Sequence, residues 1–298
     1  MELRHLRYCV AVADEESFSR AATRLRVAQP ALSRQIKALE QEVGVTLFRR
    51  LSRGVALTEP GRIFMDVARA VLADVEAAVQ KTRRAARGEI GLLRIGFTGS
   101  ASFHPFVTRA IRDYRTLYPH VDVELVEEAT ASLLARFRAN RLDVAFLRPA
   151  PGEVDHLWAT PVLTEPLVVA MPSEHPQAAR KRVDLKLLAG EEFILYPRQN
   201  GRALFDLIVS ACRDAGFSPK VLQIAPQLTS IVNLVATGIG LSIVPASIAQ
   251  VTTTGVVYRP LVQASVKAQI TLVRTDSPEP RPALVFTGMV RDMLSARR

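Results

Sequence analysis

A three-residue break between two short helical patterns, at residues 26–28, restricts the fold of this chain more than any other feature. Ser17 precedes an amphipathic stretch over residues 18–25 and is a plausible N-cap, since its hydroxyl can accept from a free backbone amide. Pro30 follows the break and is tolerated in a first helical turn, where its missing N–H would be unpaired. Gly44 then supplies a C-terminal stop. The sequence predicts two helices joined by a tight turn.

A first helical pattern over residues 3–13 precedes these two, and the third helix has two contrasting faces. At ~100° per residue, its apolar side chains fall on one side, namely Leu32, Ile36, Leu39 and Val43. The opposite side collects polar positions and a proline, namely Pro30, Arg34, Lys37 and Gln41, with Ser33 at the edge. Such a helix can pack through one face and enter a DNA major groove with the other, where Arg contacts guanine. An ordinary solvated helix has a similar polar face.

Residues 45–57 predict a β pair around a basic loop. Val45–Phe48 and Val55–Leu57 are strand-like, and Arg49–Gly54 between them is suited to phosphates or the minor groove. Eight basic residues against two acidic ones lie between Arg20 and Arg53. The small pair Ala21-Ala22 also allows close helix packing. The combination predicts a winged helix-turn-helix.

Thr58 is a plausible cap for a long helix that runs to about Gly88. Its apolar positions recur every three or four residues, at Phe64, Val67, Val71, Val75 and Val79. A small winged domain cannot cover so long a stripe, so pairing with a second copy is favoured over packing on the C-terminal half of the same chain. The basic, Gly-bounded segment KTRRAARGEIG after it is typical of a hinge.

From Gly91 onward, strand-like and helical segments alternate, which predicts a parallel sheet with helices on both faces. Ends of strands that lead into helix N-termini collect anions. Ser100 and Ser102 lie at one such junction, Thr130 at the next, where it either caps a helix or contacts a ligand, and Arg148 follows a third strand. His104 could pair with an acid there or be an ordinary surface histidine.

The segments AATRL, QPALSRQIKALE, GVTLF and LTEPG, in this order within residues 1–62, resemble the N-terminal domain of LysR-type transcriptional regulators, closest in pattern to those that control aromatic-compound catabolism. The resemblance implies an α/β chain of three parts: a winged helix-turn-helix at 1–58, a linker or dimerisation helix and hinge at 59–89, and an effector-binding domain at 90–298. That last domain resembles a type 2 periplasmic binding protein, with lobe I at about 91–162 and 268–298 and lobe II at about 163–267.

The resemblance also implies two sets of site residues. The DNA-binding set is Gln29, Pro30, Ser33, Arg34, Lys37, Arg50, Ser52 and Arg53. The effector-binding set is Ser100, Ser102, His104, Thr130, Arg148, Arg202, Phe205 and Thr229, with Arg198 beside it. We expect a small, aromatic-derived carboxylate as effector and no cofactor.

These features predict a regulator whose promoter binding and bending respond to the effector, with double-stranded DNA, its own copies as a dimer or tetramer, and RNA polymerase as partners. The net charge of +10 suits a polyanionic partner. A metabolite-binding protein or an enzyme on the same two-lobed fold is the alternative, but no catalytic or metal-ligand motif is present. Cys9 and Cys212 lie in different predicted domains, which disfavours a redox sensor. No export signal or membrane span is expected, so we predict a cytoplasmic protein.

Overall fold

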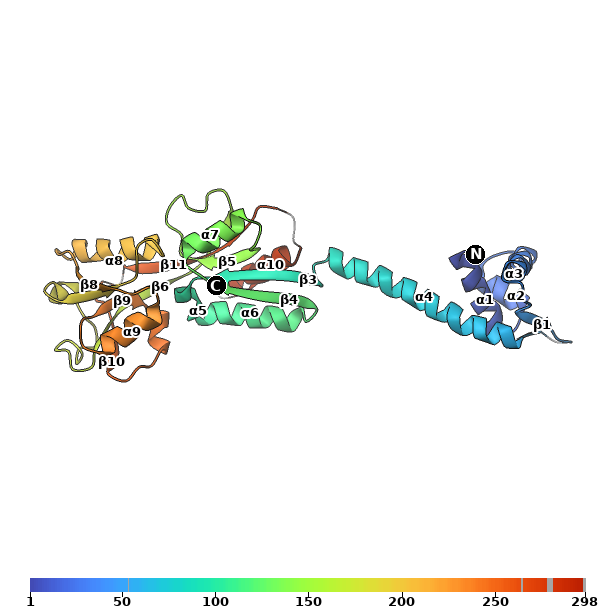
Figure 1. The fold of residues 1–298 in the computed structure, drawn as a ribbon, viewed down its shortest axis with the longest axis horizontal. Helices are drawn as coiled ribbons and strands as arrows, with labels where there is room; N and C mark the ends of the chain where they lie inside the picture. The colour runs from blue at the N-terminus through green and yellow to red at the C-terminus, as the bar shows by residue number, and fades with distance from the viewer. Residues whose placement is uncertain (53, 264, 278–280, 297–298) are drawn as a thin grey trace. The chain divides into compact units, whose positions relative to one another are not determined.

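The computed structural model describes residues 1–52, 54–263, 265–277 and 281–296. The chain forms two compact units, Met1–Arg84 and Ala85–Arg298 (Figure 1). The boundary lies within the basic segment predicted as a hinge, and each unit has hydrophobic cores of its own.

The first unit consists of α1 (Leu3–Glu15), α2 (Phe18–Leu25), α3 (Gln29–Val43), β1 (Phe48–Arg50), β2 (Val55–Leu57) and α4 (Glu59–Ala86). The predicted helix start and stop are both present. The Ser17 side chain accepts from the Arg20 amide at 3.4 Å at the start of α2, and Gly44 ends α3 with a φ of +78°. Ala21 and Ala22 are buried against α3, which packs through Leu32, Ile36 and Leu39. Val43 differs from expectation, because it lies at the end of α3 and is exposed.

The first wing strand begins later than predicted. The backbone amides of Leu47 and Phe48 donate to one oxygen of Glu40, at 2.7 and 3.0 Å. The Glu40 carboxylate thus satisfies the backbone where the sequence suggested a strand from Val45. Pairing with β2 covers only Phe48–Arg50, so Arg49 and Arg50 belong to the strand and the loop is shorter.

Helix α4 begins as the sequence predicts and ends two residues before Gly88. The Thr58 hydroxyl accepts from the Gly61 amide at 3.0 Å and donates to the Thr46 carbonyl at 2.7 Å, which ties the helix start to the wing. Ile63 and Val67 on the apolar side of α4 are 65% and 58% exposed. Phe64 of the predicted stripe packs on the core of the first unit, so only part of this face, including Ile63, Val67 and Val79, is exposed in the described part of the chain.

The second unit alternates strands and helices and has two lobes. The first lobe holds β3 (Gly91–Phe97), α5 (Gly99–Ser102), α6 (Pro105–Leu117), β4 (Val121–Glu127), α7 (Thr130–Arg138), β5 (Val144–Leu147) and α10 (Arg281–Ser295). The second holds η1 (Leu185–Leu188), β7 (Glu192–Leu195), α8 (Arg202–Asp214), β8 (Lys220–Ile224), α9 (Leu228–Ala236), β9 (Ser242–Pro245), η2 (Ala246–Gln250) and β10 (Val256–Pro260). The strands β6 (Trp158–Pro172) and β11 (Lys267–Arg274) join them.

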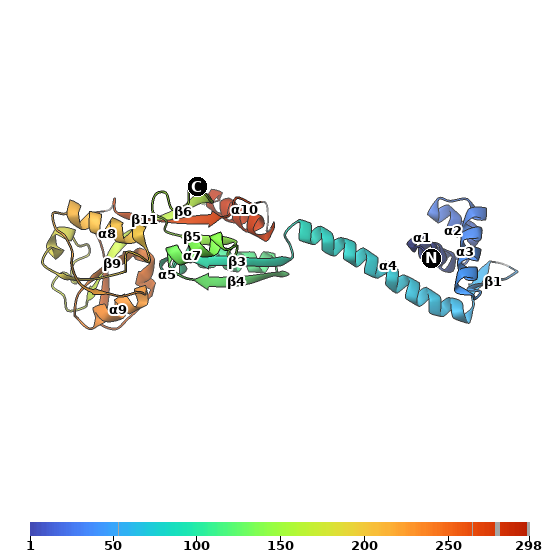
Figure 2. The same cartoon turned by 45° about the horizontal axis from the view of Figure 1, so that its top comes forward.

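One sheet runs through both lobes in the order β10-β6-β11-β5-β3-β4, and β9 also pairs with β6. Strands β3, β4 and β5 are parallel as predicted, whereas β11 and β6 run antiparallel, because they cross between lobes instead of returning through a helix. Figure 2 shows α8 and α9 in one lobe and α7 and α10 in the other, and Figure 1 shows α6 in the same lobe as α7. Helices α6 and α10 pack on one sheet face and α7 on the opposite face.

A ring cluster anchors the first lobe. Phe286 of α10 packs edge-on against Tyr114 of α6, with ring centres 5.2 Å apart, and against Phe146 of β5, at 6.0 Å. All three side chains are buried. The C-terminal helix therefore completes the core beneath the sheet whose strand ends form the site described below. None of the described helices is long and apolar enough to cross a membrane.

Candidate functional site

The outer face of α3 is polar and open to solvent. Gln29, Pro30, Arg34 and Lys37 are exposed, and Ser33 is half-buried at the edge of the face. Within the described residues, neither Arg34 nor Lys37 forms a hydrogen bond or an ion pair, so their donors are available to a ligand. This arrangement meets the geometric requirement for reading base edges from a helix.

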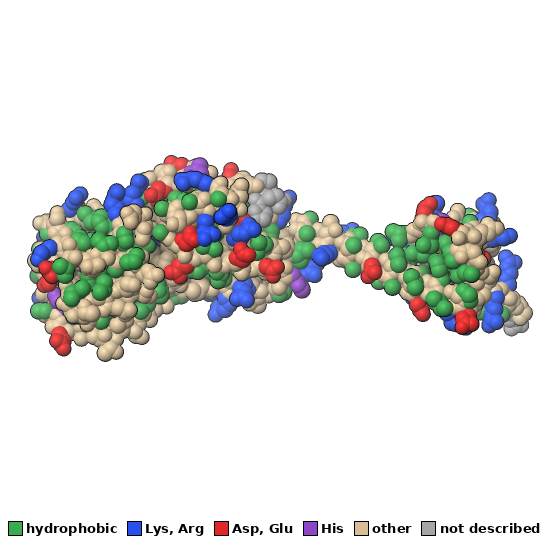
Figure 3. Space-filling model, in the orientation of Figure 1, with side chains coloured by type: hydrophobic (Ala, Val, Ile, Leu, Met, Phe, Trp, Pro, Cys, Tyr) green, Lys and Arg blue, Asp and Glu red, His purple; other side chains and the backbone are tan. Residues whose placement is uncertain are grey.

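The wing adds basic side chains beside this helix. Arg50 and Ser52 are exposed, and Arg49 precedes them on β1. The prediction for Arg53 lies outside the described residues. Figure 3 shows Lys and Arg side chains along the side of the first unit where α2, α3 and β1 lie. A polyanionic backbone is the natural partner of such a surface.

Glu40 is an acidic residue of α3 that lies close to this polar face. Its side chain is half-buried, and its Oε1 accepts from two wing amides. The carboxylate therefore serves the joint between α3 and the wing. Its charge is partly offset by those donors, which leaves the exposed part of α3 basic.

The second unit encloses a cavity of about 320 Å³ between its lobes. The first lobe contributes Thr98, Gly99, Ser100, Phe103, Glu127, Glu128, Ala129, Thr130 and Arg148, and the second contributes Tyr196, Asn200, Gly201, Leu204, Pro226, Gln227, Leu228 and Thr229. The structure thus brings together four predicted residues, Ser100, Thr130, Arg148 and Thr229. The Thr130 amide donates to the Asn200 carbonyl at 3.2 Å, which links the two walls.

Arg148 lies deeper than the sequence suggested. Its side chain is 5% exposed and forms an ion pair with Glu165 of β6, which is equally buried. Burial lowers the pKa of the Arg148 guanidinium, and the Glu165 charge opposes that shift. The cation expected to meet a ligand is therefore already neutralised by a protein carboxylate.

Arg148 also forms a hydrogen bond with Ser100. The Arg148 Nε donates to the Ser100 Oγ at 2.8 Å. With its oxygen accepting from a guanidinium, Ser100 has its own O–H left to donate, either to Thr98 Oγ1 at 3.4 Å or to a ligand. Ser100 is thus a polarised donor at the cavity wall.

Three helices point their N-termini at the cavity. Ala129, Gly201 and Gln227 are the N-cap residues of α7, α8 and α9, and none of them makes a side-chain cap hydrogen bond. Each lines the cavity, so three helix ends without side-chain caps face one common space, although the first α7 amide, that of Thr130, already donates to the Asn200 carbonyl. Amides and the helix dipole at such ends favour a negative group. Thr130 is the first helical residue, so it does not take the N-cap position that the sequence allowed.

Four predicted effector residues are absent from the described cavity lining. Ser102 donates to the Gly99 carbonyl at 2.8 Å, and the His104 Nδ1 accepts from the Phe106 amide, which makes His104 the N-cap of α6. Arg202 is exposed with its Nε 3.6 Å from Glu153, and Phe205 packs on the second lobe's core. Arg198 forms an exposed pair with Asp206. Helix capping and local ion pairs account for these positions.

Sequence reasoning did not single out Glu127, Tyr196, Asn200 or Glu165. Glu127 ends a parallel strand, and the rule that found Ser100 and Arg148 could have found it too. Glu165 carried no such signal, since an acid in a strand is usually exposed. No three His, Cys, Asp or Glu side chains of the described residues lie together as a metal site.

Both cysteines are buried. Burial raises the pKa of Cys9 to about 12 and that of Cys212 to about 11. The nucleophilic thiolate is therefore scarce at neutral pH, and the chemistry expected of a redox-sensing thiol is disfavoured at both positions.

An exposed basic helix on a winged unit and a ligand-sized cavity in a two-lobed unit define an effector-responsive, DNA-binding transcription regulator. Comparison with known families agrees: residues 3–62 match the family described as bacterial regulatory helix-turn-helix protein, lysR family, and residues 86–295 match the LysR substrate binding domain. The chain belongs to the LysR family.

Relatives extend over nearly the full length. The HTH-type transcriptional regulator AlsR of Bacillus subtilis is 36% identical over 281 residues, which cover 94% of this chain and 92% of AlsR. BenM of Acinetobacter baylyi is 37% identical over 263 residues, or 88% of this chain and 86% of BenM. These relatives are transcription regulators and not enzymes.

Among solved structures, that of CbnR, a LysR family transcriptional regulator, has a TM-score of 0.88 at 28% identity and covers 98% of this chain and 100% of its own. Full-length CbnR complexed with its target DNA gives a TM-score of 0.84 at 28% identity, with 99% and 100% covered.

Proposed function

We propose that this protein switches transcription by binding a small carboxylate between the lobes of its effector unit, and that this carboxylate is an aromatic acid. The observation that carries the proposal is the convergence of three uncapped helix N-termini with the hydroxyls of Ser100, Thr130 and Thr229 on one cavity. Amides, hydroxyls and helix dipoles together bind an anion without needing a free cation. The rings of Phe103 and Tyr196 line the same space and suit an aromatic body.

On the DNA side, α3 enters the major groove with Gln29, Pro30, Ser33, Arg34 and Lys37 toward bases and phosphates. The wing contacts the DNA backbone through Arg50 and Ser52, together with Arg53 as the sequence predicts. The free donors of Arg34 and Lys37 support this assignment. Since its proposed target is promoter DNA, the protein acts in the cytoplasm.

The protein works as a dimer through α4 and as a tetramer through the effector units. The exposed Ile63 and Val67 support the first contact. For the second, exposed apolar side chains lie on the edge strand β4, at Leu125, and on β8, at Val221 and Leu222. Two winged pairs then contact separated half-sites and bend the DNA between them.

The effector shifts this assembly by favouring one arrangement of the lobes. The bond between the Thr130 amide and the Asn200 carbonyl spans the cavity wall, so a ligand held there bears on both lobes. The resulting change in bend alters access for RNA polymerase.

Footprinting of the promoter beside the gene, with and without a panel of aromatic acids and diacids, tests the proposal. One acid should change the footprint of the unmodified protein, and the double variant Ser100→Ala, Thr130→Val should lose that change while still binding DNA. Thr108→Val, at an exposed position of α6, is the matched control. If the double variant keeps an unaltered dose response, the cavity is not the effector site.

A further inference from the structure

The effector cavity has an unbalanced negative charge. Its lining includes three charged side chains, Glu127, Glu128 and Arg148. Glu128 accepts from the Arg136 Nε at 2.9 Å, a bond that lowers the pKa of Glu128, and Arg148 is paired with Glu165. Among the described residues, no Lys, Arg or His forms an ion pair with Glu127. Three acids and two bases leave a net charge of −1 around the cavity.

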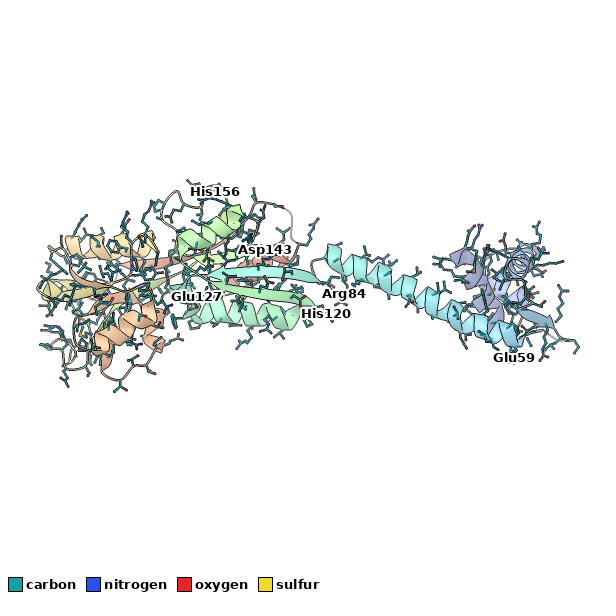
Figure 4. The ribbon with its side chains drawn as sticks, viewed as in Figure 1. Glu59, Arg84, His120, Glu127, Asp143 and His156 are labelled. Atoms are coloured by element: carbon teal, nitrogen blue, oxygen red, sulfur yellow. The ribbon has the colours of Figure 1, made fainter. Side chains whose placement is uncertain are left out.

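Glu127 lines the cavity and is also exposed to solvent. Glu127 is the last residue of β4, and Figure 4 shows it at the end of the sheet toward the second lobe. A Cβ on Gly99, which also lines the cavity, would stand 3.0 Å from Glu127 Oε1. From the other lobe, the Tyr196 phenol is close enough for the Glu127 charge to add to the burial that raises the pKa of Tyr196. The carboxylate therefore lies between the two walls.

The cavity is small compared with the reach of that charge. A sphere of 320 Å³ is about 8 Å across, close to the ~8 Å Debye length of physiological salt. Every anionic group in the cavity is thus repelled by Glu127, but the helix N-termini offset that repulsion for the one carboxylate that they bind. A second anionic group has no such compensation. A hydroxyl or ammonium group, in contrast, finds an acceptor there.

We propose that Glu127 is a specificity-determining residue that restricts the effector to monocarboxylates, preferably with a hydrogen-bond donor away from the carboxylate, and excludes dicarboxylates of the same size. This inference rests on the proposed carboxylate effector and narrows it. The helix N-termini bind one carboxylate, and Glu127 rejects a second.

Four benzoates with one para substituent each provide the test: 4-methylbenzoate, 4-(hydroxymethyl)benzoate, 4-(aminomethyl)benzoate and benzene-1,4-dicarboxylate. The ring and the first carboxylate stay constant, so differences in affinity report the second group. Calorimetry on the full-length protein should give a dicarboxylate Kd about tenfold or more above that of 4-methylbenzoate. The hydroxymethyl and aminomethyl compounds should bind at least as tightly as 4-methylbenzoate, and added salt should shrink the dicarboxylate penalty.

Glu127→Gln keeps the size of the side chain and removes its charge. In this variant the dicarboxylate penalty should fall to within about threefold, and the advantage of the aminomethyl compound should disappear. Glu124→Gln makes the same charge change on the same strand, at a position outside the cavity, and should bind like the unmodified protein. Thermal unfolding of both variants verifies that they fold.

Two results have different meanings. If 4-methylbenzoate binds but the dicarboxylate binds equally well, or if Glu127→Gln leaves the ratio unchanged, Glu127 does not set specificity and the proposed function stands. If the folded protein binds none of the four compounds, the proposed aromatic carboxylate effector is wrong, and the role of Glu127 falls with it.

Discussion

Arg148 and Glu165 form an ion pair inside the effector unit, where each side chain is only 5% exposed. Glu165 uses its other oxygen to accept from the Ser247 amide at 2.7 Å, and Arg148 Nη1 donates to the Gln269 carbonyl at 3.3 Å. The pair therefore joins the end of β5, the crossing strand β6 and the second lobe's η2. It also supports Ser100 from behind without reaching the ligand as a free cation.

Glu165→Gln should destabilise the effector unit by about 3–5 kcal/mol, because it leaves the Arg148 charge buried without its partner. The fluorescence of Trp158, the single tryptophan, reports on unfolding of this unit in urea. The double variant Arg148→Met, Glu165→Leu removes both charges and should lose less than Glu165→Gln alone. A loss below about 1 kcal/mol for the single variant would show that the pair is not electrostatically important.

Arg34→Ala should weaken operator binding by about 1–3 kcal/mol and reduce discrimination against unrelated duplexes. The reason is the loss of an exposed guanidinium that is free to contact a base edge. Fluorescence anisotropy with an operator and a scrambled duplex measures both effects. Arg112→Ala makes the same charge change on the effector unit and should leave affinity unchanged. Equal affinity for the two duplexes in the unmodified protein would contradict base reading.

Gly61→Ala and Gly288→Ala should have opposite signs, although both glycines lie in helices. A Cβ at Gly61 would fall on the Leu47 carbonyl oxygen, whereas no atom lies within 4 Å of a Cβ at Gly288. We expect a loss of about 1–3 kcal/mol at Gly61 from forced backbone movement, and a gain of about 0.5–1 kcal/mol at Gly288 from better helix propensity. Denaturant unfolding of each variant checks the signs, and a neutral Gly61→Ala would mean that the start of α4 moves freely from the wing.

Val67→Glu should shift the protein toward smaller assemblies, because it places a charge on the apolar face of α4 that we assign to pairing. Ala73→Glu adds the same charge on the opposite side of the helix and should keep the native assembly. Sedimentation velocity at matched concentrations distinguishes them. Identical sedimentation of the two variants would rule out this face as the contact.

Cys212 should make folding stability fall at alkaline pH. Its pKa is about 11 in the folded protein against an ordinary 9.0, so the unfolded chain loses its thiol proton first. The contribution of the protonated Cys212 thiol to the free energy of unfolding is therefore complete below pH 9. It declines between pH 9 and pH 11, by up to ~1.4 kcal/mol per pH unit. The free energy of unfolding is measured for the native protein and for Cys212→Ala at pH 8 and at pH 10.5. The amount by which the native value exceeds that of the variant should be about 2 kcal/mol smaller at pH 10.5 than at pH 8. A constant difference would argue against a buried, protonated thiol.

Local signals predicted the helices well. Ser17, Gly44 and Thr58 each form a hydrogen bond with a backbone group three or four residues away at a helix end, so the surrounding sequence was enough to predict these ends. The alternation of strands and helices after Gly91 gave the parallel part of the sheet for the same reason.

Long-range contacts account for what the sequence could not predict. The wing strand starts late because Glu40 reaches across to Leu47, and Arg148 is neutralised by Glu165 on a strand whose direction only the fold defines. The same contrast holds for the cavity. The positions of Ser100 and Thr130 after strand ends predicted that they line it, whereas His104 caps α6 and is absent from the described lining.

Strand β6 runs unbroken over 15 residues, with its first half hydrogen-bonded to β11 and its second half to β9 and β10. Reorienting one lobe against the other must therefore twist a hydrogen-bonded ladder, whose register with β11 shifts once, between Ile270 and Thr271. The hydrogen bonds of that ladder resist the rotation of one lobe against the other. A ligand that favours one lobe arrangement therefore has to act against the twist of these strands.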